Sequence, residues 1–317
     1  MLVLREDAVV TSIAGIQVYQ FGLCAAIGAL LAVLMLVILN KVKKQVPGAA
    51  ALQSVLCLAC GFILSRVLFG LLDASLGQVM PVWAMLRLNV GGYSLYGALA
   101  GACVGMWLAA KILRQRPAVF LDLLAPAFLA FVICERAGES CIDGFGWSRG
   151  IKSEFLHQPW LAVVDDYGSW YLMTWRLEIA IAAILLVILL IDVLKPHKAG
   201  HTFLKFMMLF GATQIIMESL RYDQHMTVRS FVRMEQIFSM VLLGVAVIIL
   251  AVRQWNRHRG LALAGLISIP VVTAAAVAIE FAIDRTDISR LLLYAVFIIL
   301  VAVPAALGFR LLKEDRA

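Results

Sequence analysis

Charged side chains are scarce in this chain of 317 residues. Asp, Glu, Lys and Arg together make up 15% of it, whereas hydrophobic residues make up 63%, and the mean hydropathy is +0.94. Soluble domains are only about 45–50% apolar. The composition therefore excludes an ordinary soluble globular protein and predicts a chain that lies mostly within a membrane.

The sequence also lacks the alternation of apolar and polar residues that marks β-barrel strands over about ten residues. It contains instead nine stretches that are free, or nearly free, of charge. These are residues 8–40, 45–65, 88–110, 123–134, 179–191, 206–217, 236–252, 260–279 and 291–309. A membrane-spanning helix needs about 20 residues, so the shorter stretches must extend into charged flanks. We therefore predict an all-α polytopic bundle of about nine transmembrane helices.

Residues that bind metals are few and poorly spaced. The chain has five His and six Cys, and no His pair has metal-ligand spacing within a predicted helix. Cys57 and Cys60 form a C-x-x-C inside an apolar stretch, where small core residues are expected. Cys134 and Cys141 could pair on an oxidising face, and the sequence leaves this open. We expect neither a metal nor a cofactor.

Basic residues gather in threes at five alternate ends of the predicted helices. The sets are Lys41, Lys43 and Lys44; Lys111, Arg114 and Arg116; Lys195, Lys198 and Lys205; Arg253, Arg257 and Arg259; and Arg310, Lys313 and Arg316. The positive-inside rule predicts that these ends are cytoplasmic, with the N-terminus outside and the C-terminus inside. The net charge of +7 forms no single basic patch, so no nucleic-acid partner is expected.

Other charged residues fall where lipid should exclude them, all in the outer half by this topology. They are Arg66, Glu135, Arg136, Glu139, Arg176, Glu178, Glu218, Arg221 and Glu235. Gln214, Glu218 and Arg221 are four and three residues apart, so they share one helix face. Each residue alone could form a structural ion pair or reach the interface. Because burial of a charge costs a few kcal/mol, we interpret the whole set as lining a polar cavity.

The cavity is suited to an anionic lipid because arginine binds phosphate through two parallel hydrogen bonds. Residues 135–172 form the longest non-hydrophobic stretch and carry several Trp and Tyr residues. Such aromatic residues are typical of a segment at headgroup depth.

Residues 90–101 contain glycines of two kinds. Gly97, Gly101 and Gly105 have the spacing of close helix packing, whereas the preceding polar residues indicate a site.

Several of these segments resemble bacterial prolipoprotein diacylglyceryl transferases. "GGYSLYGALAG" (91–101) and "LDLLAPAFLAFVICERAGES" (121–140) are similar to that family's G-G-x-S-x-H-G-G, D-L-L-A-P and G-R-x-G-N-F segments. "SRVLF" (65–69), "WRLE" (175–178), "QIIMESLRYD" (214–223) and "RMEQIFSM" (233–240) follow in the family's order. The resemblance covers about residues 12–255. We therefore divide the chain into a transferase-like seven-helix core, residues 1–255, and two additional transmembrane helices, residues 256–317.

The resemblance implies transfer of a diacylglyceryl group from phosphatidylglycerol to the lipobox cysteine thiol of a prolipoprotein. It implies as partners phosphatidylglycerol, the prolipoprotein signal peptide and the membrane. The implied location is the plasma (inner) membrane of a bacterium, as a multi-pass protein. The expected catalytic residues are Tyr96, Glu218 and Arg221. The expected substrate-binding residues are Arg136, Glu139, Arg66, Gly138, Ser94 and Gln214, with Arg136 as the motif arginine that holds the headgroup.

Four positions depart from the family pattern. Tyr96 replaces a histidine, Gln214 the first arginine of its helix, Glu139 an asparagine and Phe21 a tyrosine. A tyrosine with a pKa near 10 is a weaker base than histidine at neutral pH. The alternative function is therefore a catalytically altered or inactive paralogue that binds anionic phospholipid or scaffolds other membrane proteins. A transporter is less favoured, because no broken helix or inverted repeat is visible.

Overall fold

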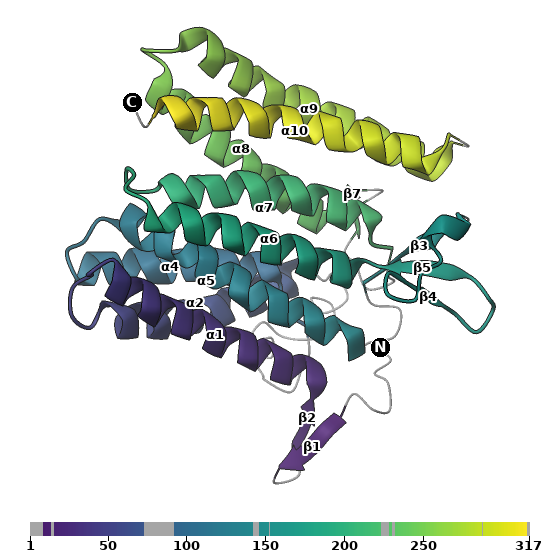
Figure 1. Cartoon of the computed structure of the whole chain (residues 1–317), viewed down its shortest axis with the longest axis horizontal. Helices are drawn as coiled ribbons and strands as arrows, with labels where there is room; N and C mark the ends of the chain where they lie inside the picture. The colour runs from purple at the N-terminus through teal and green to yellow at the C-terminus, as the bar shows by residue number, and fades with distance from the viewer. Residues whose placement is uncertain are drawn as a thin grey trace. The chain divides into compact units, whose positions relative to one another are not determined.

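The computed structural model describes residues 9–13, 16–72, 92–141, 146–151, 153–222, 228–229, 232–286 and 288–315. Within these ranges nine helices are long and apolar enough to cross a membrane (Figure 1). They are α1 (Gln20–Val42), α2 (Ala49–Leu72), α4 (Leu95–Ile112), α5 (Pro117–Gly138), α6 (Thr174–Leu194), α7 (His201–Leu220), α8 (Met234–Gln254), α9 (Arg259–Arg285) and α10 (Arg290–Glu314). The predicted all-α polytopic bundle is confirmed, and the chain is a multi-pass membrane protein.

The outward faces of these helices are apolar. Large side chains such as Leu30, Leu71 and Leu291 are 69%, 73% and 79% exposed. In water this would be an extensive aggregation surface. In a bilayer it is the surface that contacts lipid, because a helix that is apolar all round suits a membrane.

Short antiparallel sheets precede α1 and lie between later helices, and the sequence analysis did not predict them. β1 (Val9–Ile13) pairs with β2 (Ile16–Tyr19), and β6 (Val228–Arg229) pairs with β7 (Val232–Arg233). β3 (Trp147–Ile151), β4 (Ala162–Val164) and β5 (Trp170–Met173) form a sheet in the order β3-β5-β4. The apolar stretch 8–40 thus begins as a hairpin rather than a helix, because its first residues are rich in Val, Ile and Thr, which favour strands.

The chain divides into two compact units. The first comprises residues 1–24, 133–185 and 204–317, and the second residues 25–132 and 186–203. In the first unit α8, α9 and α10 pack against one another (Figure 1). Close packing of α10 on α7 is visible at Gly308, where an added Cβ would lie 2.4 Å from the Met208 sulfur. Tyr294 of α10 also donates a hydrogen bond of 3.0 Å to the Ser219 carbonyl oxygen.

In the second unit α2 and α4 pack closely along the predicted glycine stripe. A Cβ added at Gly101 would lie 2.2 Å from the carbonyl oxygen of Cys60, and one at Gly105 would lie 2.6 Å from the carbonyl carbon of Leu56. Both obstructing atoms belong to backbone, which cannot rotate away. The prediction that these glycines serve helix packing is confirmed.

Replacing Gly101 by alanine should therefore separate α2 from α4 and destabilise the protein by about 1–3 kcal/mol, the usual cost of overpacking. Thermal unfolding of the detergent-purified variant measures this. Gly22→Ala in α1 is the matched control, because a Cβ at Gly22 meets nothing within 4 Å. Equal melting temperatures for Gly101→Ala and the unmodified protein would contradict the packing argument.

Candidate active site

A cluster of six charged side chains lies buried in the first unit. They are Glu135 and Arg136 near the end of α5, Glu139 directly after it, Glu178 in α6, Glu218 in α7 and Arg221 directly after α7. Their side chains are at most 14% exposed. Three segments that are far apart in the sequence thus bring four carboxylates and two guanidinium groups together. We call this group the Arg–Glu cluster.

Arg136 lies at the centre of the Arg–Glu cluster. Its Nε is 2.7 Å from a carboxylate oxygen of Glu178 and 3.5 Å from one of Glu135. Its Nη1 donates to Glu139, and its Nη2 lies 3.9 Å from Glu218. Every nitrogen of this guanidinium thus faces a carboxylate. Of the charges that the sequence places at one depth, these contacts bring together those of α5, α6 and α7.

Arg221 joins the cluster from the other side. Its Nη2 is 3.0 Å from a Glu139 oxygen, and its Nη1 is 3.4 Å from a Glu178 oxygen. The residue is one position beyond α7, and its backbone forms an isolated bridge with Ser148 of β3. The following residue continues this link, since the Tyr222 amide donates to the Trp147 carbonyl at 2.8 Å. The β3 strand therefore holds the backbone of Arg221 in position, and with it the Cα atom from which the side chain extends.

A carboxylate oxygen and an amide oxygen on α7 are unsatisfied among the described residues. The Oε2 atom of Glu218 and the Oε1 atom of Gln214 are buried and have no hydrogen-bond partner. The two residues are 1% and 2% exposed and lie one helical turn apart. Buried polar atoms are rarely left unpaired in folded proteins. This edge of the cluster is therefore where polar atoms of a bound molecule would complete the hydrogen bonding.

Two glycines allow the chain to pass close to the cluster. An added Cβ at Gly138 would lie 3.1 Å from Cys24 and from Phe21 at the start of α1. Gly146 has a φ of +65°, and a Cβ there would lie 2.9 Å from a Glu139 oxygen. The Gly146 carbonyl accepts a 2.7 Å hydrogen bond from the Thr174 hydroxyl. The loop after α5 is thereby held against the first residue of α6.

The other predicted site residues, Arg66, Ser94 and Tyr96, belong to the second unit. Arg66 is 1% exposed; it donates to the Gly92 carbonyl and lies 5.0 Å from the Tyr93 ring centroid. Ser94 is the N-cap of α4, and its hydroxyl accepts from the Gly97 amide at 3.2 Å. Tyr96 is 7% exposed. Gly91, which belongs to the same motif, lies outside the described residues.

Some residues singled out in the sequence have other surroundings. Arg176 donates to the carbonyl oxygens of Pro159 and Trp160 at 3.2 and 2.7 Å, and so braces the loop rather than contacting the Arg–Glu cluster. Cys134 and Cys141 are not joined by a disulfide. The aromatic loop between α5 and α6 contains the β3-β5-β4 sheet, which the sequence analysis missed.

Sequence reasoning also missed Arg233 and the pair formed by Gln236 and Glu280. Arg233 is 7% exposed and directly precedes α8. The Gln236 side-chain amide donates to Glu280 of α9 at 2.6 Å and to the Ile215 carbonyl of α7 at 3.4 Å. A usable signal was present, because Glu280 is the sole charged residue between Arg259 and Asp284. Buried ionisable residues inside a membrane are expensive and often functional.

Comparison with known proteins agrees with this architecture. The family model described as prolipoprotein diacylglyceryl transferase matches residues 8–252. A phosphatidylglycerol–prolipoprotein diacylglyceryl transferase of Lactobacillus gasseri is 24% identical over 79% of this chain and 92% of its own length. Proteins of the same name from Clostridium perfringens and Staphylococcus epidermidis are 25% and 26% identical, over 80% and 78% of this chain and 97% and 89% of theirs.

The match contains the whole Arg–Glu cluster and ends before α9 and α10. Identities near 25% over most of both lengths mark a divergent relative, consistent with the changed motif positions. This chain belongs to the prolipoprotein diacylglyceryl transferase family.

Proposed function

We propose that this protein transfers a diacylglyceryl group from phosphatidylglycerol to the lipobox cysteine thiol of prolipoproteins. The observation that carries the proposal is the Arg–Glu cluster, which lies entirely within the family match. A protein that only bound or scaffolded lipid would not need proton-accepting carboxylates beside buried guanidinium groups. The names of the relatives also favour the enzyme over the lipid-binding paralogue.

In the reaction, the thiol proton passes to Glu218, whose Oε2 atom is free to accept it. The thiolate sulfur attacks the glyceryl carbon that carries the phosphate ester, a sulfur–carbon bond forms and the carbon–oxygen bond breaks. The bonding electrons stay on the phosphate oxygen, and glycerol 1-phosphate leaves. The products are a thioether and a phosphate monoester, which can take the proton from Glu218.

The guanidinium groups are suited to stabilising the charge that develops on the leaving phosphate. Arg136 and Arg221 are held by Glu139 and Glu178, so little reorganisation is needed as charge develops. Both guanidinium groups now contact carboxylates. A bound phosphate would accept hydrogen bonds from the same nitrogens alongside those carboxylates. On the family resemblance we also propose Tyr96, which stands where the family has histidine, as a catalytic residue, and Arg66, Ser94 and Gly138 as substrate-binding residues.

We further propose that the cluster faces the outer side of a bacterial inner membrane, where both substrates can reach it. The basic helix ends support this orientation through the positive-inside rule. Phosphatidylglycerol and the prolipoprotein signal peptide would then enter sideways from the bilayer. Residues 1–255 would form the transferase core, and residues 256–317 two helices added to it.

The orientation predicts that a cysteine at position 160 is labelled from outside and one at position 198 only from inside. Trp160 is 68% exposed and Lys198 is also exposed, so both sites are accessible to reagent. Trp160→Cys and Lys198→Cys would be made in a chain whose six cysteines are replaced. A membrane-impermeant thiol reagent is applied to intact and to permeabilised cells. Labelling of position 160 only after permeabilisation would reverse the proposed topology.

Arg136→Lys is expected to lower transfer at least roughly tenfold while the protein still folds. The ammonium keeps the charge among the carboxylates but cannot reproduce the guanidinium fork. Arg136→Ala should also unfold more easily, by about 3–5 kcal/mol, because it leaves buried carboxylates uncompensated. The matched control is Arg176→Lys, which lies outside the cluster. Thermal unfolding and thioether formation are measured on the same samples. Normal transfer by Arg136→Lys would move the headgroup site to another arginine.

Glu218→Gln is expected to lower kcat roughly 10²- to 10⁴-fold, the usual range for losing a general base. The amide has the same shape but cannot accept the thiol proton, so KM for phosphatidylglycerol should change little. Transfer to a lipobox peptide measures both constants. Glu154→Gln, at an exposed loop position, is the control. A Glu218→Gln enzyme that kept its kcat would place the proton acceptor elsewhere.

A further inference from the structure

Arg233 is a buried cation that directly precedes α8. It is 7% exposed, and its Nη1 atom has no hydrogen-bond partner among the described residues. Burial lowers the pKa of Arg233, and the nearby carboxylates of Glu218 and Glu280 act in the opposite direction. Arginine nevertheless stays protonated in proteins. A buried charged donor without an acceptor costs free energy. An anionic ligand that accepted a hydrogen bond from Arg233 would remove that cost.

The unpaired atoms around Arg233 complement one kind of molecule. Arg233 offers a cationic donor, while Gln214 Oε1 offers a neutral acceptor and Glu218 Oε2 a charged one. Gln214 and Glu218 are one turn apart on α7, and Arg233 lies close enough to Glu218 for a direct electrostatic effect. A phosphate with an attached glycerol matches this set. The anionic phosphate oxygens would accept hydrogen bonds from Arg233, and a glycerol hydroxyl would donate one to Gln214 Oε1.

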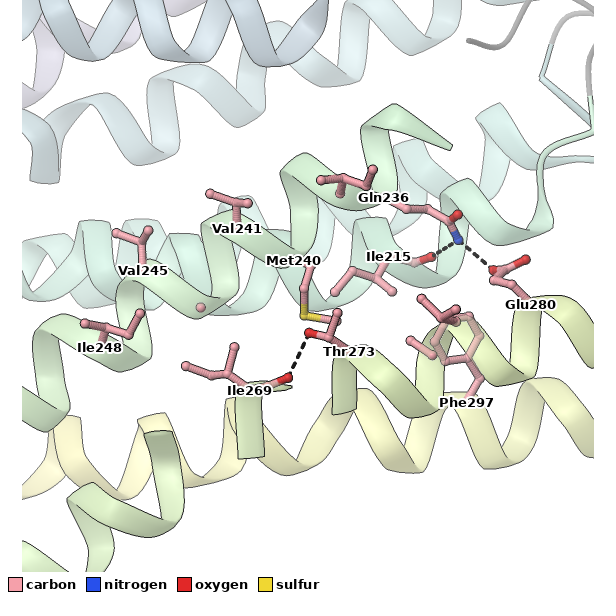
Figure 2. A pocket seen from close by; sticks show the side chains of 14 residues that line it. Ile215, Gln236, Met240, Val241, Val245, Ile248, Ile269, Thr273, Glu280 and Phe297 are labelled. Atoms are coloured by element: carbon pink, nitrogen blue, oxygen red, sulfur yellow. Dashed lines mark hydrogen bonds between the residues drawn. The ribbon is translucent and has the colours of Figure 1, made fainter. Parts of the chain in front are cut away.

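An apolar groove runs between α8 and α9. It has a volume of about 390 Å³, and Figure 2 shows Gln236 and Glu280 at one end of it and Ile248 towards the other. Arg233 is tied to the polar end, since its backbone amide donates to the Gln236 side chain at 3.2 Å. The walls open to lipid, because Val241 and Ile248 are 55% and 43% exposed.

We propose that Arg233 binds the phosphate of phosphatidylglycerol while one acyl chain of that lipid lies in the groove between α8 and α9. The inference rests on the proposed function and names the headgroup contact within it. Gln214 stands where the resemblance places an arginine, so Arg233, directly before α8, supplies the cation that α7 lacks. Glu280 does not bind the phosphate; it accepts from the Gln236 side chain, which in turn accepts from the Arg233 backbone amide.

The occupant of the groove is a lipid chain for a physical reason. The groove lies on a helix surface with exposed apolar side chains, where hydrocarbon is the surrounding solvent. A chain that enters there needs no opening of the bundle, and its headgroup arrives at the polar end formed by Gln236 and Glu280. α9 forms one wall, although it lies beyond the residues matched by the family model. This gives α9 a part in substrate binding.

The test compares the full-length protein with Arg233→Gln and Arg233→Lys in detergent micelles. Native mass spectrometry measures retained phosphatidylglycerol, and a lipobox-peptide assay gives its KM and kcat. Arg233→Gln should weaken lipid binding at least tenfold and raise KM by a similar factor, with a smaller change in kcat. Arg233→Lys should be intermediate. Arg253→Gln, at the opposite end of α8 with a 40% exposed side chain, should behave like the unmodified protein.

A second variant tests the groove without touching a charge. Gly244 lines the groove, and a Cβ there would meet Ile269 at an ordinary 3.5 Å, so Gly244→Leu should fold and fill the space. Its affinity for long-chain phosphatidylglycerol should fall, whereas that for a dioctanoyl form should fall less. Equal affinities of Gly244→Leu and the unmodified protein for both lipids would overturn the groove assignment.

Excess inorganic phosphate separates a lipid site from a free-phosphate site. Long-chain phosphatidylglycerol should stay bound because its acyl chain lies in the groove, and its full displacement by inorganic phosphate would overturn the groove assignment. Unchanged lipid affinity and KM in Arg233→Gln, with normal transfer by the unmodified protein, would overturn the Arg233 inference alone. Lipid binding that depends on Arg233 but gives no thioether product would overturn the proposed function and leave the binding site standing.

Discussion

The rest of the first unit depends on the contact between Arg136 and its surrounding carboxylates. An isolated charge in a low-dielectric interior is very costly, and only close pairing makes its burial tolerable. Arg136 meets Glu178 at 2.7 Å and also contacts Glu139 and Glu135. Because these partners come from α5, its following turn and α6, the ion pairs fix the angle at which these segments meet. In the proposed mechanism, substrate chemistry is thus built on the group that also holds the helices together.

The Arg–Glu cluster contains more carboxylates than guanidinium groups, so its carboxylates are not all equally paired. Four carboxylates share two guanidinium groups, and Glu218 is the least engaged of them, with Arg136 no closer than 3.9 Å. A carboxylate that is buried yet weakly paired can accept a proton more readily than one locked in a short ion pair. Glu139 and Glu178 instead contact both arginines. In the proposed mechanism, position within the cluster therefore separates the proton acceptor from the residues that orient the guanidinium groups.

The membrane architecture and the charged residues of the cluster could be predicted from the sequence, because charged residues are rare within apolar membrane-spanning stretches. Arg136, Glu178 and Glu218 were recognisable as charges at one depth, and the structure brings them together. Arg233 escaped notice because one arginine at a helix start resembles an interfacial residue, and only burial distinguishes it. The role of Ser94 as a helix cap and the β1-β2 hairpin depend on local backbone geometry, which hydropathy does not record.

The two helices outside the family match are linked to the site through the β3 strand. Arg149 of β3 pairs with Asp284 of α9 and lies 4.3 Å from the Tyr222 ring centroid. The neighbouring Ser148 bridges to the backbone of Arg221, which carries one of the two guanidinium groups of the cluster. A shift of α9 would therefore move β3 and, through it, the Arg221 side chain. Because a displacement of about 1 Å can cost a catalytic group much of its effect, α9 supports the cluster as well as forming a wall of the groove.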